Sequence, residues 1–159
     1  MKYISIIQKE FIKYADDLSG VVHFEREKRL TLNELLPEVK GIVPIIIKQG
    51  ILREVRDNDG KCVVYARVRM KRENGDTKYI LGVKNLKLQQ ESEVEISKEM
   101  FDGFFPDNVL KPQVKARYVL PNGWEIDKVL GKNEIYAEYE YDSTKELNDI
   151  KVPEHWVVK

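Results

Sequence analysis

The sequence predicts an α+β protein in which eight antiparallel strands close into a barrel, or tunnel, with flanking helices. Short runs rich in β-branched and aromatic residues are separated by hairpin turn signals, at residues 57–60 (Asp-Asn-Asp-Gly) and 74–75 (Asn-Gly). Charged residues recur at every second position in these runs, which is the period of a β-strand. A chain of 159 residues, 42% of them apolar, is long enough for one domain with a core.

The elements follow one another without an internal repeat or a linker. Residues 1–20 are expected to form an amphipathic helical extension, because apolar residues recur at steps of three and four from Ile4 to Leu18. A short helix or loop is predicted over residues 31–40. A second helix is predicted over residues 97–105, with Ser97 as its N-cap. Residues 21–159 then form one domain, and closing its sheet into a barrel would remove exposed edges. The strands are predicted at 21–30, 42–53, 61–72, 77–86, 89–96, 111–120, 124–130 and 135–142.

The composition excludes several classes of function. The chain has 27 Lys and Arg and 27 Asp and Glu, so its formal net charge is zero, and bulk attraction to nucleic acid or to a membrane surface is not expected. No apolar run approaches the roughly 18 residues of a membrane span, and the first residues are too polar for a signal peptide. A single cysteine, Cys62, fits a reducing compartment, so a cytoplasmic location is expected.

The in-phase charges are segregated by sign from strand to strand. Cations occupy these positions in three of the predicted strands, carboxylates occupy them in three others, and the first strand carries both. The charged face could lie outside a barrel filled with apolar residues, which is the usual arrangement, or it could line a central tunnel. Segregation favours the tunnel. The cations are Arg29, Arg67, Arg69, Lys84, Lys115 and Arg117, and the carboxylates are Glu25, Glu27, Glu91, Glu93, Glu95, Glu125, Asp127, Glu138 and Glu140.

Such a lining has a specific chemistry. An unpaired buried charge costs several kcal/mol, so the two sets must compensate each other or a ligand must fill the space. Arginine and lysine side chains that converge on one axis suit a polyanion such as a polyphosphate. The carboxylates suit a hard divalent cation, Mg²⁺ or Mn²⁺, which takes oxygen ligands and bridges to phosphates.

These motifs resemble the CYTH superfamily, the triphosphate tunnel metalloenzymes, over residues 21–156. The family opens with Glu-x-Glu-x-Lys, and here the corresponding residues are Glu25-Arg-Glu-Lys-Arg29. The later matches, in order, are Ile47-Lys-Gln-Gly-Ile-Leu52, Arg67-Val-Arg69, Leu81-Gly-Val-Lys84, Glu91-x-Glu93-x-Glu95-Ile96, Lys115-Ala-Arg117-Tyr118, Trp124-Glu-Ile-Asp127, Ala137-Glu-Tyr-Glu140 and Pro153-x-x-Trp156.

The resemblance implies a tunnel that holds a triphosphate compound, together with a role for each charged residue. The six cations named above would bind phosphate oxygens. Glu25, Glu27, Glu138 and Glu140 would hold Mg²⁺ or Mn²⁺, and Glu91, Glu93 and Glu95 would hold a second metal or orient water. Arg29, Glu125 and Asp127 would be catalytic, with in-line positioning and charge neutralisation promoting hydrolysis.

The chain also departs from the family pattern. Arg29 replaces the last lysine of the opening motif, and Gln89 stands where many members have an arginine. The N-terminal extension is an addition, expected to plug one tunnel mouth or to pack at a homodimer contact. The expected function is hydrolysis of tripolyphosphate or a nucleoside triphosphate. The alternatives are a class IV adenylate cyclase, a noncatalytic nucleotide or polyphosphate binder, and a β-barrel interaction domain with solvated charges. The cyclase is disfavoured because His23 and Phe24 lie nearer the opening motif than they do in class IV cyclases.

Overall fold

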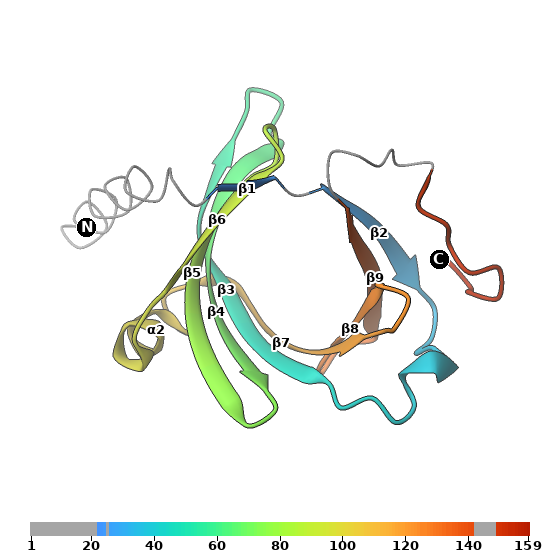
Figure 1. Ribbon diagram of the computed structural model, residues 1–159. Coiled ribbons are helices and arrows are strands. Elements are labelled where there is room, and N and C mark those ends of the chain that lie inside the picture. Colours follow the sequence, from blue (N-terminus) through green and yellow to red (C-terminus); the bar gives the residue numbers. More distant parts are fainter. Residues whose placement is uncertain (1–21, 25, 142–148) are drawn as a thin grey trace.

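The structure is a computed structural model that describes residues 22–24, 26–141 and 149–159. Within these residues, nine strands form a single antiparallel sheet that curls around an open centre (Figure 1). The helical extension predicted over residues 1–20 lies outside the described residues. The strands are β1 (Val22–Phe24), β2 (Arg26–Leu32), β3 (Ile45–Arg56), β4 (Cys62–Glu73), β5 (Asp76–Asn85), β6 (Gln90–Glu95), β7 (Leu110–Val119), β8 (Glu125–Val129) and β9 (Glu134–Tyr141).

The predicted closed barrel is corrected to an open sheet. Its order is β1-β6-β5-β4-β3-β7-β8-β9-β2, so β1 and β2 are the two edge strands. The run predicted as one first strand is divided between them: β1 pairs with β6, whereas β2 pairs with β9. The two edges are neighbours in sequence but do not pair with each other, and the sheet therefore curls nearly into a ring without a closed ladder of hydrogen bonds.

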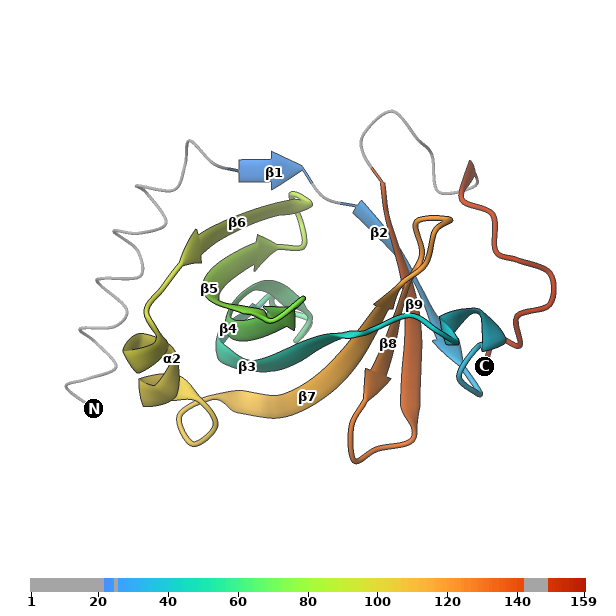
Figure 2. The same cartoon turned by 60° about the horizontal axis from the view of Figure 1, so that its bottom comes forward.

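The helices among the described residues are short. Helix α2 (Lys98–Phe104) begins after Ser97, whose Oγ accepts a hydrogen bond from the backbone N–H of Met100 at 3.1 Å, as the sequence predicts. It packs outside β4 and β5, where Phe101 joins an apolar cluster (Figure 2). A 3-10 helix covers Pro37–Val39, within the predicted helix or loop. In the described part of the chain, no helix is long and apolar enough to cross a membrane.

The apolar core lies on the convex side of the sheet and not in its centre. A larger cluster packs the outer faces of β2, β8 and β9 against the C-terminal segment, and it includes Trp124 and Trp156, 2% and 6% exposed, with their rings edge to face at 5.0 Å. A smaller cluster joins Val68 and Leu81 to α2. Because side chains alternate along a strand, burying one face of β4, β7 and β9 outward turns their charged face inward. Of the two arrangements that the sequence left open, the charged interior is the one observed.

Candidate functional site

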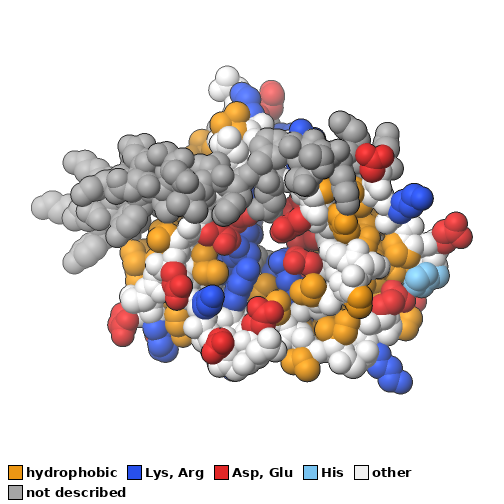
Figure 3. All heavy atoms as spheres, in the orientation of Figure 1, with side chains coloured by type: hydrophobic (Ala, Val, Ile, Leu, Met, Phe, Trp, Pro, Cys, Tyr) orange, Lys and Arg blue, Asp and Glu red, His pale blue; other side chains and the backbone are white. Residues whose placement is uncertain are grey.

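The concave side of the sheet encloses a cavity of about 820 Å³ lined mainly by charged side chains. Figure 3 shows the hollow from its open end, with Lys and Arg on one wall and Asp and Glu beside them. All six predicted cations line it, from β2, β4, β5 and β7. They are Arg29, Arg67, Arg69, Lys84, Lys115 and Arg117.

The first group of ion pairs joins β4, β5 and β6 with β2. Arg67 Nη2 lies 2.9 Å from Glu91 Oε1, and Arg69 Nη2 lies 3.6 Å from the same oxygen. Arg69 also pairs with Glu93, and Lys84 Nζ lies 3.5 Å from Glu27 Oε2. Since Glu91 is only 6% exposed, it acts as a buried counter-charge shared by two arginines. The charges of β4 are thus held by carboxylates two strands away.

The second group lies across β7, β8 and β9 and is centred on Arg117. Its Nε and Nη2 donate hydrogen bonds to Asp127 at 2.7 and 2.8 Å, while Nη1 lies 2.7 Å from Glu125 Oε2 and Nη2 donates to Glu138 at 3.1 Å. Lys115 Nζ donates to the second oxygen of Asp127 at 2.6 Å. Asp127 is 1% exposed and does not line the cavity. It lies beneath the two cations that do.

Burial and ion pairing act in opposite directions on these groups. Burial alone would lower the pKa of Arg117, but its hydrogen bond to Asp127 and the charges of Asp127, Glu125 and Glu138 raise the pKa above its ordinary value. Burial would raise the pKa of Asp127, but the hydrogen bond from Arg117 and the charges of Arg117 and Lys115 hold it below its ordinary value. Burial and the nearby Arg117 lower the pKa of Lys115. Asp127 therefore stays ionised, and Arg117 keeps its charge in the buried site.

Arg29 occupies a different position from the other cations. Its side chain is 52% exposed, at the rim of the cavity, and its Nε lies 3.5 Å from Glu138 Oε1. The guanidinium carbon lies 4.1 Å from the ring centroid of Tyr136, a cation–π contact. The Tyr136 hydroxyl in turn donates a hydrogen bond to Glu134 at 3.1 Å. Arg29 is thus held by the aromatic ring of Tyr136, a residue that the sequence analysis did not select.

Several buried polar atoms of the wall lack partners among the described residues. Arg67 Nε and Arg69 Nε are buried donors without an acceptor, and Gln49 Oε1 is a buried acceptor without a donor. All three residues line the cavity. A buried donor without a partner costs free energy, and an anion in this cavity could accept hydrogen bonds from both arginines.

The carboxylates predicted to hold a metal are only partly assembled. Glu27, Glu138 and Glu140 line the cavity, whereas Glu25 lies outside the described residues. Burial raises the pKa of Glu140, and the charges of Glu125, Glu27 and Glu91 raise it further against the opposing Arg117. A divalent cation would relieve the repulsion among these carboxylates, and carboxylate oxygens are ligands that suit Mg²⁺ or Mn²⁺. The described residues nevertheless contain no group of three or more His, Cys, Asp or Glu side chains poised around one metal position.

The remaining predicted carboxylates are divided between the cavity and its surroundings. Glu91, Glu93 and Glu125 line the cavity and are engaged by arginines. Glu95 is exposed at the end of β6 and does not line it.

Some wall residues were not selected from the sequence. Lys71 continues the two-residue spacing of Arg67 and Arg69, and Glu134 has the same parity as Glu138, so the alternation that selected the others could have found both. Glu54 could not be found this way, because a β-bulge in β3 between Ile51 and Arg53 reverses the parity and turns Glu54 inward, opposite Tyr65.

Comparisons with known proteins give a likeness of fold. No family model matches the chain, and no curated protein matches it. Among solved structures, one described as the hypothetical protein NE1496 matches with a TM-score of 0.50 and 19% identity over 84% of this chain and 87% of the other. The PH1819 protein from Pyrococcus horikoshii OT3 matches with a TM-score of 0.51 and 22% identity, covering 79% and 81%. Another structure, described as the inorganic triphosphatase NE1496, has a TM-score of 0.48 and 18% identity, covering 83% and 86%.

The fold class is therefore that of NE1496 and PH1819, an antiparallel sheet curled around a central space. At these identities the likeness is one of fold, and it agrees with the curled antiparallel sheet that the motifs led us to expect.

Proposed function

We propose that this protein is a metal-dependent hydrolase of a triphosphate compound, tripolyphosphate or a nucleoside triphosphate, bound in the charged cavity. The observation that carries the proposal is the convergence of six predicted cations on one cavity, together with the buried, unpartnered Nε donors of Arg67 and Arg69. A volume of about 820 Å³ suits a small molecule. Guanidinium groups in such a place match the paired oxygens of phosphoryl groups.

The charge balance of the wall supports a requirement for a divalent cation. Among the described residues that line the cavity, nine are Lys or Arg and eight are Glu. A triphosphate brings several negative charges into a space that is already nearly neutral, so the lysines and arginines cannot compensate it alone. Glu27, Glu138 and Glu140, with Glu25, are the residues that would hold Mg²⁺ or Mn²⁺. When bound, the metal would supply positive charge to the phosphate oxygens and polarise them.

The chain's own residues have distinct roles in this proposal. Arg67, Arg69, Lys84, Lys115 and Arg117 bind phosphate oxygens, and Arg29 contacts the substrate from the rim. Glu125 reaches the cavity and orients a water molecule. The water oxygen bonds to phosphorus as the P–O anhydride bond breaks, the pyrophosphate or nucleoside diphosphate leaves with the electrons of that bond, and the proton of the water passes to solvent. Asp127 cannot reach the substrate while its oxygens bind Lys115 and Arg117. In place of the catalytic role predicted from the motif, we propose that Asp127 positions these two cations.

A noncatalytic binder is the second candidate, and one observation favours it. Glu125, the carboxylate available to orient water, already lies 2.7 Å from Arg117 Nη1, so it serves as a counter-charge to that arginine.

The test is to incubate the purified protein with tripolyphosphate or ATP and with Mg²⁺ or Mn²⁺, and to measure phosphate and cyclic AMP. Phosphate release without cyclic AMP supports the hydrolase, cyclic AMP supports the cyclase, and saturable binding without turnover supports the binder. Arg69→Met should abolish release, whereas Arg53→Met on neighbouring β3, an exposed residue that does not line the cavity, should not. Thermal unfolding of both variants would verify that they fold.

A further inference from the structure

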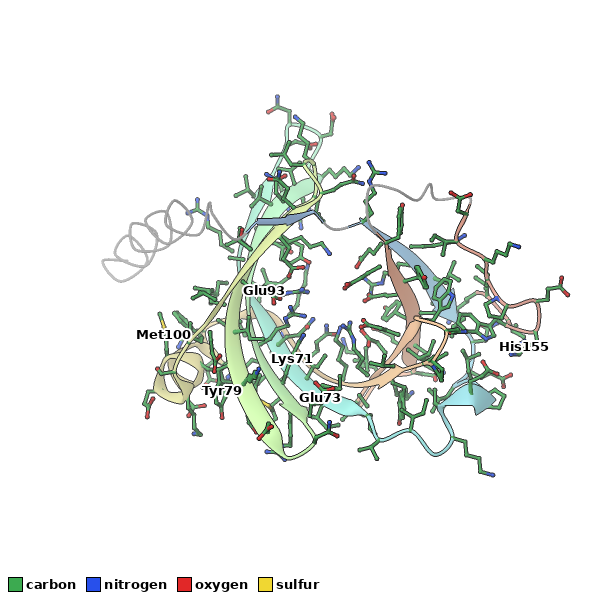
Figure 4. All side chains as sticks on the ribbon, in the orientation of Figure 1. Lys71, Glu73, Tyr79, Glu93, Met100 and His155 are labelled. Carbon is green, nitrogen blue, oxygen red and sulfur yellow. The ribbon has the colours of Figure 1, made fainter. Side chains whose placement is uncertain are left out.

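Lys71 is a cation of the cavity wall outside the motifs that resemble the family. It follows Arg67 and Arg69 on β4 at the same two-residue spacing, so alternation along the strand turns all three side chains into the cavity, and all three line it. It lies within the ring of strands (Figure 4). In the sheet, Lys71 and Lys115 pair with the same residue of β3, Ile47, from opposite sides.

Lys71 is half-buried, and among the described residues it has no counter-charge within ion-pair distance, in contrast to the six cations predicted from the sequence. Arg67, Arg69, Lys84 and Arg117 each lie within 3.6 Å of a carboxylate oxygen, as does Lys115. Among the described residues, Lys71 makes no hydrogen bond and no ion pair. Its charged neighbours are mainly cations: burial lowers the pKa of Lys71, and Arg69, Arg117 and Arg67 lower it further, while Glu93 opposes them.

We propose that Lys71 is a further anion-binding residue of this cavity, and that its ammonium group contacts a phosphoryl oxygen of the bound compound. The choice of ligand rests on the proposed function. The other cations divide their charge between a carboxylate and the anion, whereas Lys71 has no ion pair to weaken among the described residues. Its long side chain and compact charge also suit a phosphate oxygen.

The position of Lys71 also predicts an effect on the stability of the free protein. This effect distinguishes an anion-binding residue from one that only supports the sheet. In the free protein three arginines repel the charge of Lys71, Glu93 offsets only part of this repulsion, and no carboxylate of the described residues lies within ion-pair distance, so the charge opposes folding. Removing that charge should stabilise the free protein while it weakens anion binding. A lysine that only supports the sheet would show a loss of stability instead.

The experiment measures tripolyphosphate binding by calorimetry in the full chain with Mg²⁺, for wild type, Lys71→Met, Lys71→Arg and Lys48→Met. Lys48 is the matched control, because it lies on neighbouring β3, is exposed and does not line the cavity. Lys71→Met should raise the Kd about tenfold or more, as expected for the loss of a charged hydrogen bond, and should keep or raise the midpoint of thermal unfolding. Lys71→Arg should retain most of the affinity, and Lys48→Met should bind as wild type does.

The outcomes separate this inference from the proposed function. If wild type binds tripolyphosphate and Lys71→Met binds it as tightly as Lys48→Met, Lys71 is not an anion-binding residue and the proposed function stands. If Lys71→Met loses both binding and thermal stability, its role is structural and the inference fails. If wild type binds neither tripolyphosphate nor ATP with either metal, both proposals are wrong.

Discussion

Asp127 accepts two hydrogen bonds from Arg117, from Nε at 2.7 Å and from Nη2 at 2.8 Å, in a bidentate pair that is almost completely buried. The same carboxylate accepts a hydrogen bond from Lys115 at 2.6 Å. One carboxylate on β8 therefore holds two cations of β7 against the cavity. The pair links the stability of the sheet to the arrangement of the site.

Asp127→Asn should destabilise the protein strongly. The amide carries no charge, so Lys115 and Arg117 would lose the counter-charge that they share. Removing one partner of a buried ion pair costs about 3–5 kcal/mol, and urea denaturation would measure the change in the free energy of unfolding. The matched control is Asp102→Asn, which removes an exposed partner of Lys98 on α2 and should leave stability almost unchanged. Equal effects of the two substitutions would contradict the role given to Asp127.

Stability should also fall in acid through Asp127. Its pKa in the folded protein is held below the ordinary value of 3.8, so folding favours the ionised form. The stabilisation is therefore fully present above the unfolded pKa and is lost as pH falls from about 4 through the lower folded pKa. Urea denaturation from pH 6 downward would measure it, and the slope below about pH 4 should be shallower in Asp127→Asn. An unchanged slope in this variant would show that other carboxylates control the acid transition.

Much of the site was predictable because strand alternation is a local property. Once β4 and β7 are strands, Arg67 and Arg69 share a face, as do Lys115 and Arg117, and the apolar residues between them face the other way. The segregation of the charges by sign from strand to strand then predicted that this face is turned inward. The same reasoning would have included Lys71 had it been extended by one more step along β4.

Other features depended on interactions that the local pattern does not contain. The bulge that turns Glu54 inward changes the parity of β3 without an obvious turn residue. The first predicted strand is divided because its two parts pair with different strands, β1 with β6 and β2 with β9. The sheet is open for the same reason, since these two parts do not pair with each other. Parity placed Asp127 with the inward charges, but it could not show that the carboxylate lies beneath Lys115 and Arg117 and does not reach the cavity.

The contact between Arg29 and Tyr136 should contribute to substrate binding or turnover. The ring lies 4.1 Å from the guanidinium carbon and limits the positions of a side chain that is 52% exposed. Tyr136→Leu should lower the efficiency of phosphate release, kcat/KM, by about fivefold, from a cation–π contribution of about 1 kcal/mol. Tyr136→Phe should retain most of the efficiency because it keeps the ring.

A double-mutant cycle with Arg29→Met tests whether Tyr136 acts through Arg29. In the Arg29→Met background, Tyr136→Leu should have little further effect, because the cation that it positions is gone. Additive losses in kcat/KM would show that the two residues act independently and would contradict the positioning role.

Glu140 should affect the dependence of the reaction on its divalent cation. Burial and the charges of Glu125, Glu27 and Glu91 raise its pKa, so a bound cation would relieve repulsion among these carboxylates. Chelation by EDTA should abolish phosphate release, and Mg²⁺ or Mn²⁺ should restore it. Glu140→Gln should move the metal activation curve to about tenfold higher concentration, because one oxygen ligand loses its charge. Glu99→Gln, at an exposed residue in the first turn of α2, should leave the curve unchanged. Full activity in EDTA would overturn the metal requirement. Identical activation curves for both variants would show that Glu140 is not a ligand and would leave the metal requirement standing.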